Sequence, residues 1–186
     1  MHTSFKALST GSVPGAAWVA AFALAAATLP AHAAGKVEVS YVQPEQFTDA
    51  GTGARERERT LRALTRHFEQ LARRLPDGQT LRVEVLDVDL AGFVRPFGVH
   101  ELRVLRGGAD WPHMTLRYTL ASGCPPAAAG ADEACAGRTI KAGEDQLADL
   151  NYLFYRGGIS GLGGELPYEK RMLDHWFGAT FAAVQP

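Results

Sequence analysis

The chain has 186 residues, of which 46% are hydrophobic and 21% are charged, with 19 basic against 20 acidic residues. This near-neutral balance excludes a protein that binds nucleic acid through a strongly basic face. The apolar content is that of an ordinary globular protein, and a chain of this length can bury a core without a structural metal or a dense disulfide framework.

The first 33 residues predict a secretory signal peptide. MHTSFKALSTGSVPG contains Lys6 and no acidic residue, AAWVAAFALAAATL is a short apolar run, and Ala31-His32-Ala33 is a small-x-small end. This order is typical of a signal that is cleaved after Ala33 or Ala34. The alternative is an uncleaved membrane anchor, but the run is shorter than the ~20 apolar residues that span a bilayer. We therefore expect an exported chain with no integral membrane span after cleavage.

Cleavage leaves residues 34–186, which we expect to form a single α+β domain. Lys6 is the basic residue removed with the signal, so 19 basic residues become 18 against 20 acidic residues, and the net charge falls from −1 to −2. The mature chain therefore gives no reason to expect a nucleic acid partner.

The domain begins with a predicted strand and a predicted helix. In KVEVSYV, residues 36–42, apolar residues alternate with polar ones, which is typical of a half-buried strand. In residues 54–75 the apolar residues recur at helical spacing and form one stripe, made of Leu61, Leu64, Phe68, Leu71 and Leu75. The other face of this helix is rich in arginine. These arginines either bind an anionic partner or are simply solvated.

The next predicted strand, residues 80–90, changes its phase. Val83 and Val85 alternate with charged residues, but the apolar positions then move to Leu86, Val88 and Leu90. Asp87 and Asp89 thereby share one face about 7 Å apart, the spacing of a hard-cation site. The alternative is a β-bulge near Leu86 that sends Leu86, Val88 and Leu90 into the core. In that case the two carboxylates accept hydrogen bonds from nearby amides or from arginines such as Arg95 and Arg103.

Three further strands are predicted at about 99–106, 112–121 and 137–147, and short links between successive strands favour antiparallel pairing. Cys124 and Cys135 lie between the last two strands. In an exported protein such a pair predicts a disulfide, whereas a redox-active pair would have the closer Cys-x-x-Cys spacing.

The end of the chain combines a glycine-rich connector, residues 156–165, with a helix that begins at Pro167. Gly161 and Gly163 lack the third glycine of a dinucleotide loop, and the connector has no Gly-Lys-Ser/Thr of a phosphate loop. Tyr168, Met172 and Trp176 give the helix an apolar face that can lie on a sheet. The whole order is strand, helix, four strands, helix, which predicts an α+β fold with a mostly antiparallel sheet of four to five strands and both helices on one face.

Four blocks of the sequence resemble the bacterial domain-of-unknown-function family 3016. They are QPEQFTD, LPDGQTLRVEVLDVDLAG, GEDQLADLNY and YEKRMLDHWF, they occur in the family's order, and they extend over nearly the whole mature chain. The resemblance implies an exported, periplasmic protein of Gram-negative bacteria. It implies no activity and no catalytic residues.

Two classes of function remain open on the sequence. The first is a non-enzymatic, envelope-associated binding module without a cofactor, whose partner is an envelope protein or ligand and whose candidate contact residues are Arg95, Tyr168 and Trp176. The second is a metal-dependent hydrolase built on Asp87 and Asp89. His100 and His113 are its further candidate ligands, because they lie near the ends of two strands that could pair.

Overall fold

The structure is a computed structural model that describes residues 35–97, 100–122, 137–154 and 165–181. All of these lie within one compact unit, residues 32–186. In chain order the elements are β1 (Lys36–Tyr41), the 3-10 helix η1 (Pro44–Gln46), α1 (Ala54–Ala72), β2 (Gln79–Asp89), β3 (Phe93–Phe97), β4 (His100–Val104), β5 (His113–Ser122), β6 (Thr139–Ala148) and α2 (Pro167–Phe181). The α+β class is confirmed.

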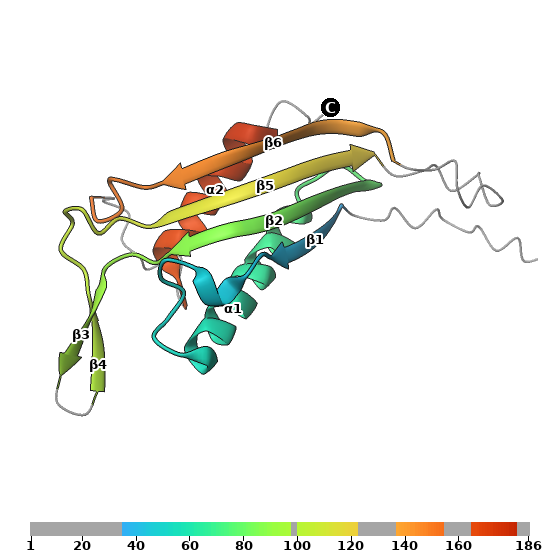
Figure 1. The fold of residues 1–186 in the computed structure, drawn as a ribbon. Helices are drawn as coiled ribbons and strands as arrows, with labels where there is room; N and C mark the ends of the chain where they lie inside the picture. Colours follow the sequence, from blue (N-terminus) through green and yellow to red (C-terminus); the bar gives the residue numbers. More distant parts are fainter. Residues whose placement is uncertain (1–34, 98–99, 123–136, 155–164, 182–186) are drawn as a thin grey trace, which may run out of the picture. The chain divides into compact units, whose positions relative to one another are not determined.

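The main sheet has four strands in the order β1-β2-β5-β6 (Figure 1). β2 pairs antiparallel with β5, and β5 pairs antiparallel with β6, as the short links predict. β1 and β2 are parallel, because α1 carries the chain back along the sheet between them and such a crossover returns the next strand in the same direction. The sheet is therefore mixed rather than purely antiparallel.

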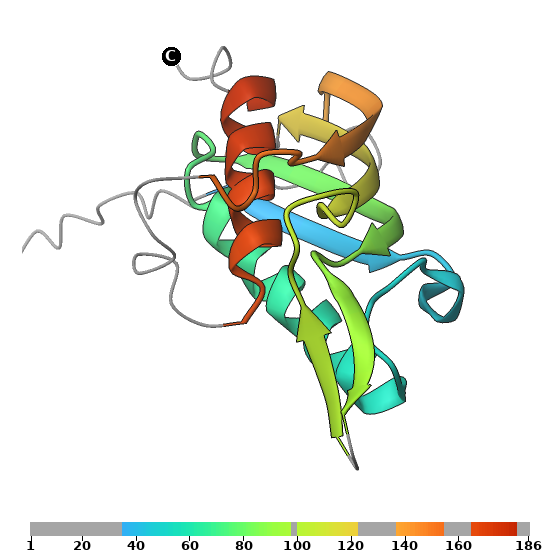
Figure 2. The same ribbon diagram turned by 90° about the vertical axis from the view of Figure 1, so that its left-hand side faces the viewer.

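Both helices cover one face of this sheet (Figures 1 and 2). The largest cluster of buried apolar side chains lies between the two layers and draws on α1, β2, β5 and α2. Its fully buried members include Leu64, Phe68, Leu81, Leu116 and Phe177. The predicted stripe on the first helix is confirmed at Leu64, Phe68 and Leu71. His67 is also buried, and its Nε2–H donates to the Lys170 carbonyl of α2 at 3.0 Å, which links the two helices.

The phase change in β2 is a β-bulge at Leu86. Val85 stands opposite Leu116 and Asp87 stands opposite Thr115, so Leu86 has no opposing residue of its own. The extra residue returns Val88 and Leu90 to the core, where both are buried. The bulge prediction is confirmed, but the expected burial of Leu86 is wrong, because the unpaired residue of a bulge is turned out of the alternation and this side chain is only half-buried.

The strand expected near residues 99–106 does not join the main sheet. It is β4, which forms a separate two-stranded hairpin with β3. β3 was not predicted. Pro96 cannot donate a ladder hydrogen bond, and a proline in a sequence argues against a central strand. In a two-stranded hairpin every strand has a free edge, and Pro96 is tolerated there.

Several predictions fall on residues that the structure does not describe. These are the signal peptide at 1–33, Cys124 and Cys135, and the connector at 156–165 apart from Glu165. Around the cysteine segment, the last pairs of β5 and β6 are formed, with Ser122 N–H donating to the Arg138 carbonyl at 3.0 Å. Within the described ranges, no helix has both the length and the hydropathy that crossing a membrane requires.

Trp176 gives a direct test of the helix-on-sheet packing. It is 5% exposed and its ring makes edge contacts with Phe68, Tyr118 and Phe181. We expect Trp176→Ala to lower the free energy of unfolding by about 3 to 5 kcal/mol, because a large cavity would be left in the core. Urea denaturation measures this loss. Ile140→Ala, at an exposed apolar side chain of β6, is the control and should change stability by less than about 0.5 kcal/mol; a loss below about 1 kcal/mol at Trp176 would contradict the packing.

Candidate functional site

Asp87 and Asp89 project from the same side of β2, beyond the bulge. Asp87 accepts two hydrogen bonds from Thr48, one from the backbone N–H and one from Oγ1, both at 2.8 Å. These bonds attach the segment after η1 to the sheet. The prediction that a nearby amide holds this carboxylate is confirmed for Asp87.

Asp89 lies in a different environment. Burial raises the pKa of its carboxyl group, and the nearby carboxylates of Asp49 and Asp87 act in the same direction, while His113 opposes them. Its Oδ2 is 3.6 Å from Nδ1 of His113 on the neighbouring strand. The backbones of Asp49 and Asp89 form an isolated parallel bridge, so β2 gains a short extension of pairing at this end.

The histidine candidates are separated by the fold. His113 pairs with Asp89 in the main sheet, whereas His100 pairs with Phe97 in the hairpin. The two strands, which the sequence allowed to pair with each other, do not pair. The indole N–H of Trp111 donates to Nε2 of His113. In a neutral imidazole the nitrogen that accepts a hydrogen bond is also the one that would accept a proton as a general base, so this hydrogen bond occupies it.

Asp87, Asp89 and His113 form no recognisable metal centre with one another or with other described residues. Among the described residues, no three His, Cys, Asp or Glu side chains are placed so that they could share a metal ion. The hydrolase alternative built on Asp87 and Asp89 thus gains no support from the geometry, and the role of these residues as ligands stays a prediction.

A polar network that sequence reasoning missed lies at the base of the hairpin. Arg103 of β4 donates two hydrogen bonds to Asp49, at 2.8 and 3.1 Å, and a further one to the Ala91 carbonyl at 3.3 Å. The Ala91 N–H donates to Glu169 of α2 at 2.8 Å. Glu169 is 2% exposed, and burial raises its pKa. The network joins the hairpin, the loop after η1 and the beginning of α2.

Arg103 was one of the groups expected to donate a hydrogen bond to Asp87 or Asp89, but it pairs with Asp49. The sequence holds one signal for this network: Arg103 alternates with apolar Leu102 and Val104, so its side chain had to point to the opposite face of the strand. Asp49 and Glu169 lie 54 and 66 positions from Arg103, and nothing local predicts the contact.

The hairpin also presents an apolar face. Opposing residues on this face are Phe93 with Val104 and Arg95 with Leu102, and Phe97 follows them on β3. Phe97 is 71% exposed and Leu102 is 53% exposed. The guanidinium groups of Arg95 and Arg106 lie over the Phe93 ring, at 5.6 and 4.6 Å from its centroid.

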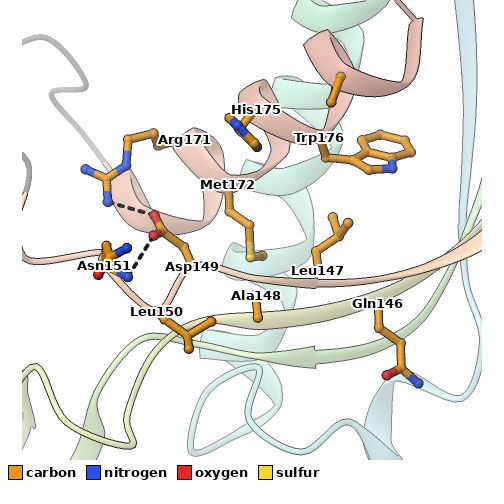
Figure 3. Close-up of a pocket in the computed structure, with 11 residues that line it drawn as sticks. Gln146, Leu147, Ala148, Asp149, Leu150, Asn151, Arg171, Met172, His175 and Trp176 are labelled. Carbon is orange, nitrogen blue, oxygen red and sulfur yellow. Dashed lines mark hydrogen bonds and ion pairs between the residues drawn. The ribbon is translucent and has the colours of Figure 1, made fainter.

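A groove of about 610 Å³ runs between β6 and α2 (Figure 3). Met172 points from the helix toward the strand, and Leu147 points from the strand toward the helix. One end holds an ion pair between Arg171 and Asp149, whose Nη2 and Oδ2 atoms are 2.9 Å apart. The groove is therefore apolar where Leu147, Met172 and Trp176 meet and polar at that end, and Gln146 and His175 also line it.

The three residues predicted to contact a partner lie in different settings. Arg95 is exposed on the hairpin. Tyr168 is buried beside Tyr152. Trp176 is buried in the main core and also lines the groove. Their contact with a partner stays a prediction.

The fold and these surfaces define an α+β protein with a mixed four-stranded sheet, two helices on one face and an attached hairpin. The model of the family described as "Protein of unknown function (DUF3016)" matches residues 35–179. The chain belongs to this family, as its four sequence blocks predicted. No curated protein and no solved structure matches the chain.

A melting experiment tests whether Asp87 and Asp89 bind a cation. We expect calcium or magnesium to leave the melting temperature of the wild type unchanged, because Asp87 is already bonded to Thr48. A cation present at a hundred times its dissociation constant would add about 2.7 kcal/mol. The double variant Asp87→Asn, Asp89→Asn is the control. A rise in melting temperature confined to the wild type would show that the carboxylates are a cation site.

Glu169 predicts a pH dependence of stability. Its folded-state pKa is raised above the ordinary value of 4.5, so the folded protein holds this proton more tightly than the unfolded chain. Stability from this group is present below pH 4.5 and is lost as the pH rises through the folded-state pKa. Glu169→Gln keeps a neutral group there, so we expect its free energy of unfolding, relative to wild type, to increase from pH 4.5 upward.

Denaturation curves at a series of pH values measure this difference. Asp89 is present in both proteins, so its own titration largely cancels in the comparison. Glu45→Gln, at an exposed glutamate, should run parallel to the wild type. A wild type that gains stability relative to Glu169→Gln as the pH rises would contradict the sign.

Proposed function

We propose that this protein is a non-enzymatic binding module of the bacterial envelope, exported to the periplasm, and that it holds a protein partner through the β3–β4 hairpin. The proposal rests on one observation: the hairpin exposes large apolar side chains on a face that is firmly attached to the domain. The signal peptide predicted for residues 1–33 supports export.

The attachment distinguishes this hairpin from a loose loop. An isolated two-stranded hairpin is marginally stable in water. Here Arg103 projects from the opposite face of β4 and is bonded to Asp49 and to the Ala91 carbonyl. Because charge-assisted, two-pronged hydrogen bonds are strong and geometrically specific, they hold the apolar face in a fixed orientation. A preorganised surface loses less entropy when it binds.

The composition of the face favours a protein over a lipid surface. Phe97 and Leu102 supply apolar area, and Arg95 supplies a cation beside them; aromatic residues and arginine are enriched in protein interfaces. Binding to anionic lipid relies on clusters of four to eight basic residues. Arg95 is exposed on the hairpin and Arg106 is exposed just after it. The whole chain has a net charge of −1.

Site-specific photocrosslinking in cells tests this contact. The whole chain carries Phe97→p-benzoylphenylalanine, and the periplasmic and membrane fractions are both analysed for covalent adducts by electrophoresis and mass spectrometry. We expect one discrete protein adduct at position 97, weakened by Arg95→Glu, because reversing the charge removes the cation beside the apolar face. Ile140→p-benzoylphenylalanine, on another exposed apolar side chain, is the control and should give none.

Three outcomes would overturn the proposal. They are the absence of a discrete adduct at position 97, equal adducts at positions 97 and 140, and adducts with phospholipid alone. An adduct with a second copy of the chain would replace the envelope partner by self-association.

A further inference from the structure

We propose that β6 and α2 form a second binding site, which takes an extended peptide segment of another protein as a strand added to the outer edge of β6. The site lies on elements other than the hairpin, so it goes beyond the function proposed above and does not depend on it.

The first observation is the free edge of β6. β6 is the last strand of the sheet, and no strand in the described part of the chain pairs with its outer side. Asp149 N–H donates to the Pro112 carbonyl at 3.3 Å, and Leu147 stands opposite Met114. Backbone groups in an antiparallel ladder point to alternate sides. The N–H and C=O groups of Gln146 and Ala148 therefore point away from β5, toward an added strand.

The second observation is the groove beside that edge. Its walls include Leu147 from β6 and Met172, Trp176 and Ala179 from α2, around a volume of about 610 Å³ (Figure 3). Clefts of a few hundred cubic ångströms are typical of ligand-binding pockets. Strand addition combines main-chain hydrogen bonds with pockets for alternate side chains, and this edge offers both together.

The third observation limits where a strand can add. Natural edge strands are protected by bulges and lysines, and β6 has both at its beginning. Ile140 is an extra residue, since Leu120 pairs with Lys141 and Ala121 pairs with Thr139. Lys141 Nζ donates to the Thr180 carbonyl of α2 at 2.8 Å, which links strand and helix beyond the groove. The unprotected region runs from Glu144 to Ala148.

The fourth observation specifies the peptide. On the exposed face of the sheet, Arg117 bridges Glu84 and Glu144, at 2.9 and 3.0 Å. The three charged side chains Glu84, Arg117 and Glu144 thus form a row across β2, β5 and β6, and the carboxylate of Glu144 lies at its end, at the free edge. Opposite charges on neighbouring strands stabilise a sheet, so an added strand is favoured by Lys or Arg beside Glu144. Side chains alternate along a strand, so the peptide residues on either side of this basic residue face the apolar part of the groove and are expected to be apolar. The occupant is an extended segment of apolar, basic, apolar pattern without proline.

The test uses a displayed library of random linear twelve-residue peptides, selected against the purified whole chain. We expect enriched sequences with a basic residue between apolar ones. A synthetic copy of an enriched peptide is then titrated by fluorescence anisotropy. Ala148→Pro removes an outward N–H beside the groove, and we expect it to weaken binding at least about tenfold, equivalent to about 1.4 kcal/mol.

Matched controls separate binding from folding. Ala142→Pro makes the same change at another outward-pointing, exposed residue of β6, away from the groove, and should leave binding within about twofold of wild type, well below 1.4 kcal/mol. Ala179→Trp fills the groove and should abolish binding, whereas Ala54→Trp, on exposed α1 surface, should not. Glu144→Arg should shift the enriched sequences from basic to acidic at the central position. Phe97→Ser should bind normally, so failure of the hairpin proposal would leave this one intact.

Other results would overturn the proposal. They are a library that yields no enriched sequence, peptides that bind Ala148→Pro or Ala179→Trp as well as wild type, and enrichment that ignores Glu144→Arg. If the whole chain is a dimer by light scattering and Ala148→Pro makes it a monomer, the edge belongs to a second copy and not to a peptide.

Discussion

The bulge at Leu86 is the constraint on which the rest of the structure depends. β2 is one of the two inner strands of the sheet and pairs with β1 on one side and with β5 on the other. Its side chains must supply the core along its whole length. Without the extra residue, Asp87 and Asp89 would point at the helices, where two carboxylates would have to be buried without partners at a cost of several kcal/mol. With it, Val88 and Leu90 are buried and both carboxylates are turned to the other face.

That rotation also organises the end of the sheet where the polar groups gather. Asp87 holds Thr48, and the loop after η1 brings Asp49 to Arg103. Arg103 in turn fixes the hairpin, and Ala91 connects this group to Glu169 at the beginning of α2. These contacts link residues far apart in the sequence, so each helps to determine how the hairpin is held. The same network explains why a projecting two-stranded ribbon can keep a defined orientation.

The two proposed binding surfaces use different chemistry. The hairpin offers side chains, with Phe97 and Leu102 exposed beside Arg95, and such a surface selects a partner by shape and apolar area. The groove beside β6 offers main-chain donors and acceptors as well as side chains, and it selects an extended conformation first and a sequence second. A protein with both surfaces could hold two partners at once. In the region of Asp87 and His113, in contrast, the contacts observed are internal, with Thr48 holding Asp87 and Trp111 donating to His113.

The sequence by itself determined the family, the α+β class, the two helices and the bulge. These depend on local information: the stripe of Leu64, Phe68 and Leu71 has helical spacing, and the shift from Val85 to Val88 is visible in the order of the residues. The tertiary structure decided the parallel pairing of β1 with β2, the separation of His100 from His113, and the pairing of Arg103 with Asp49. Each of these depends on which distant segments meet. Alternation shows which face of a strand a side chain occupies, but it does not show which strand lies next to it, and Pro96 made β3 difficult to recognise until its free edge was known. The groove was beyond sequence reasoning for the same reason, because it exists only where α2 lies along β6.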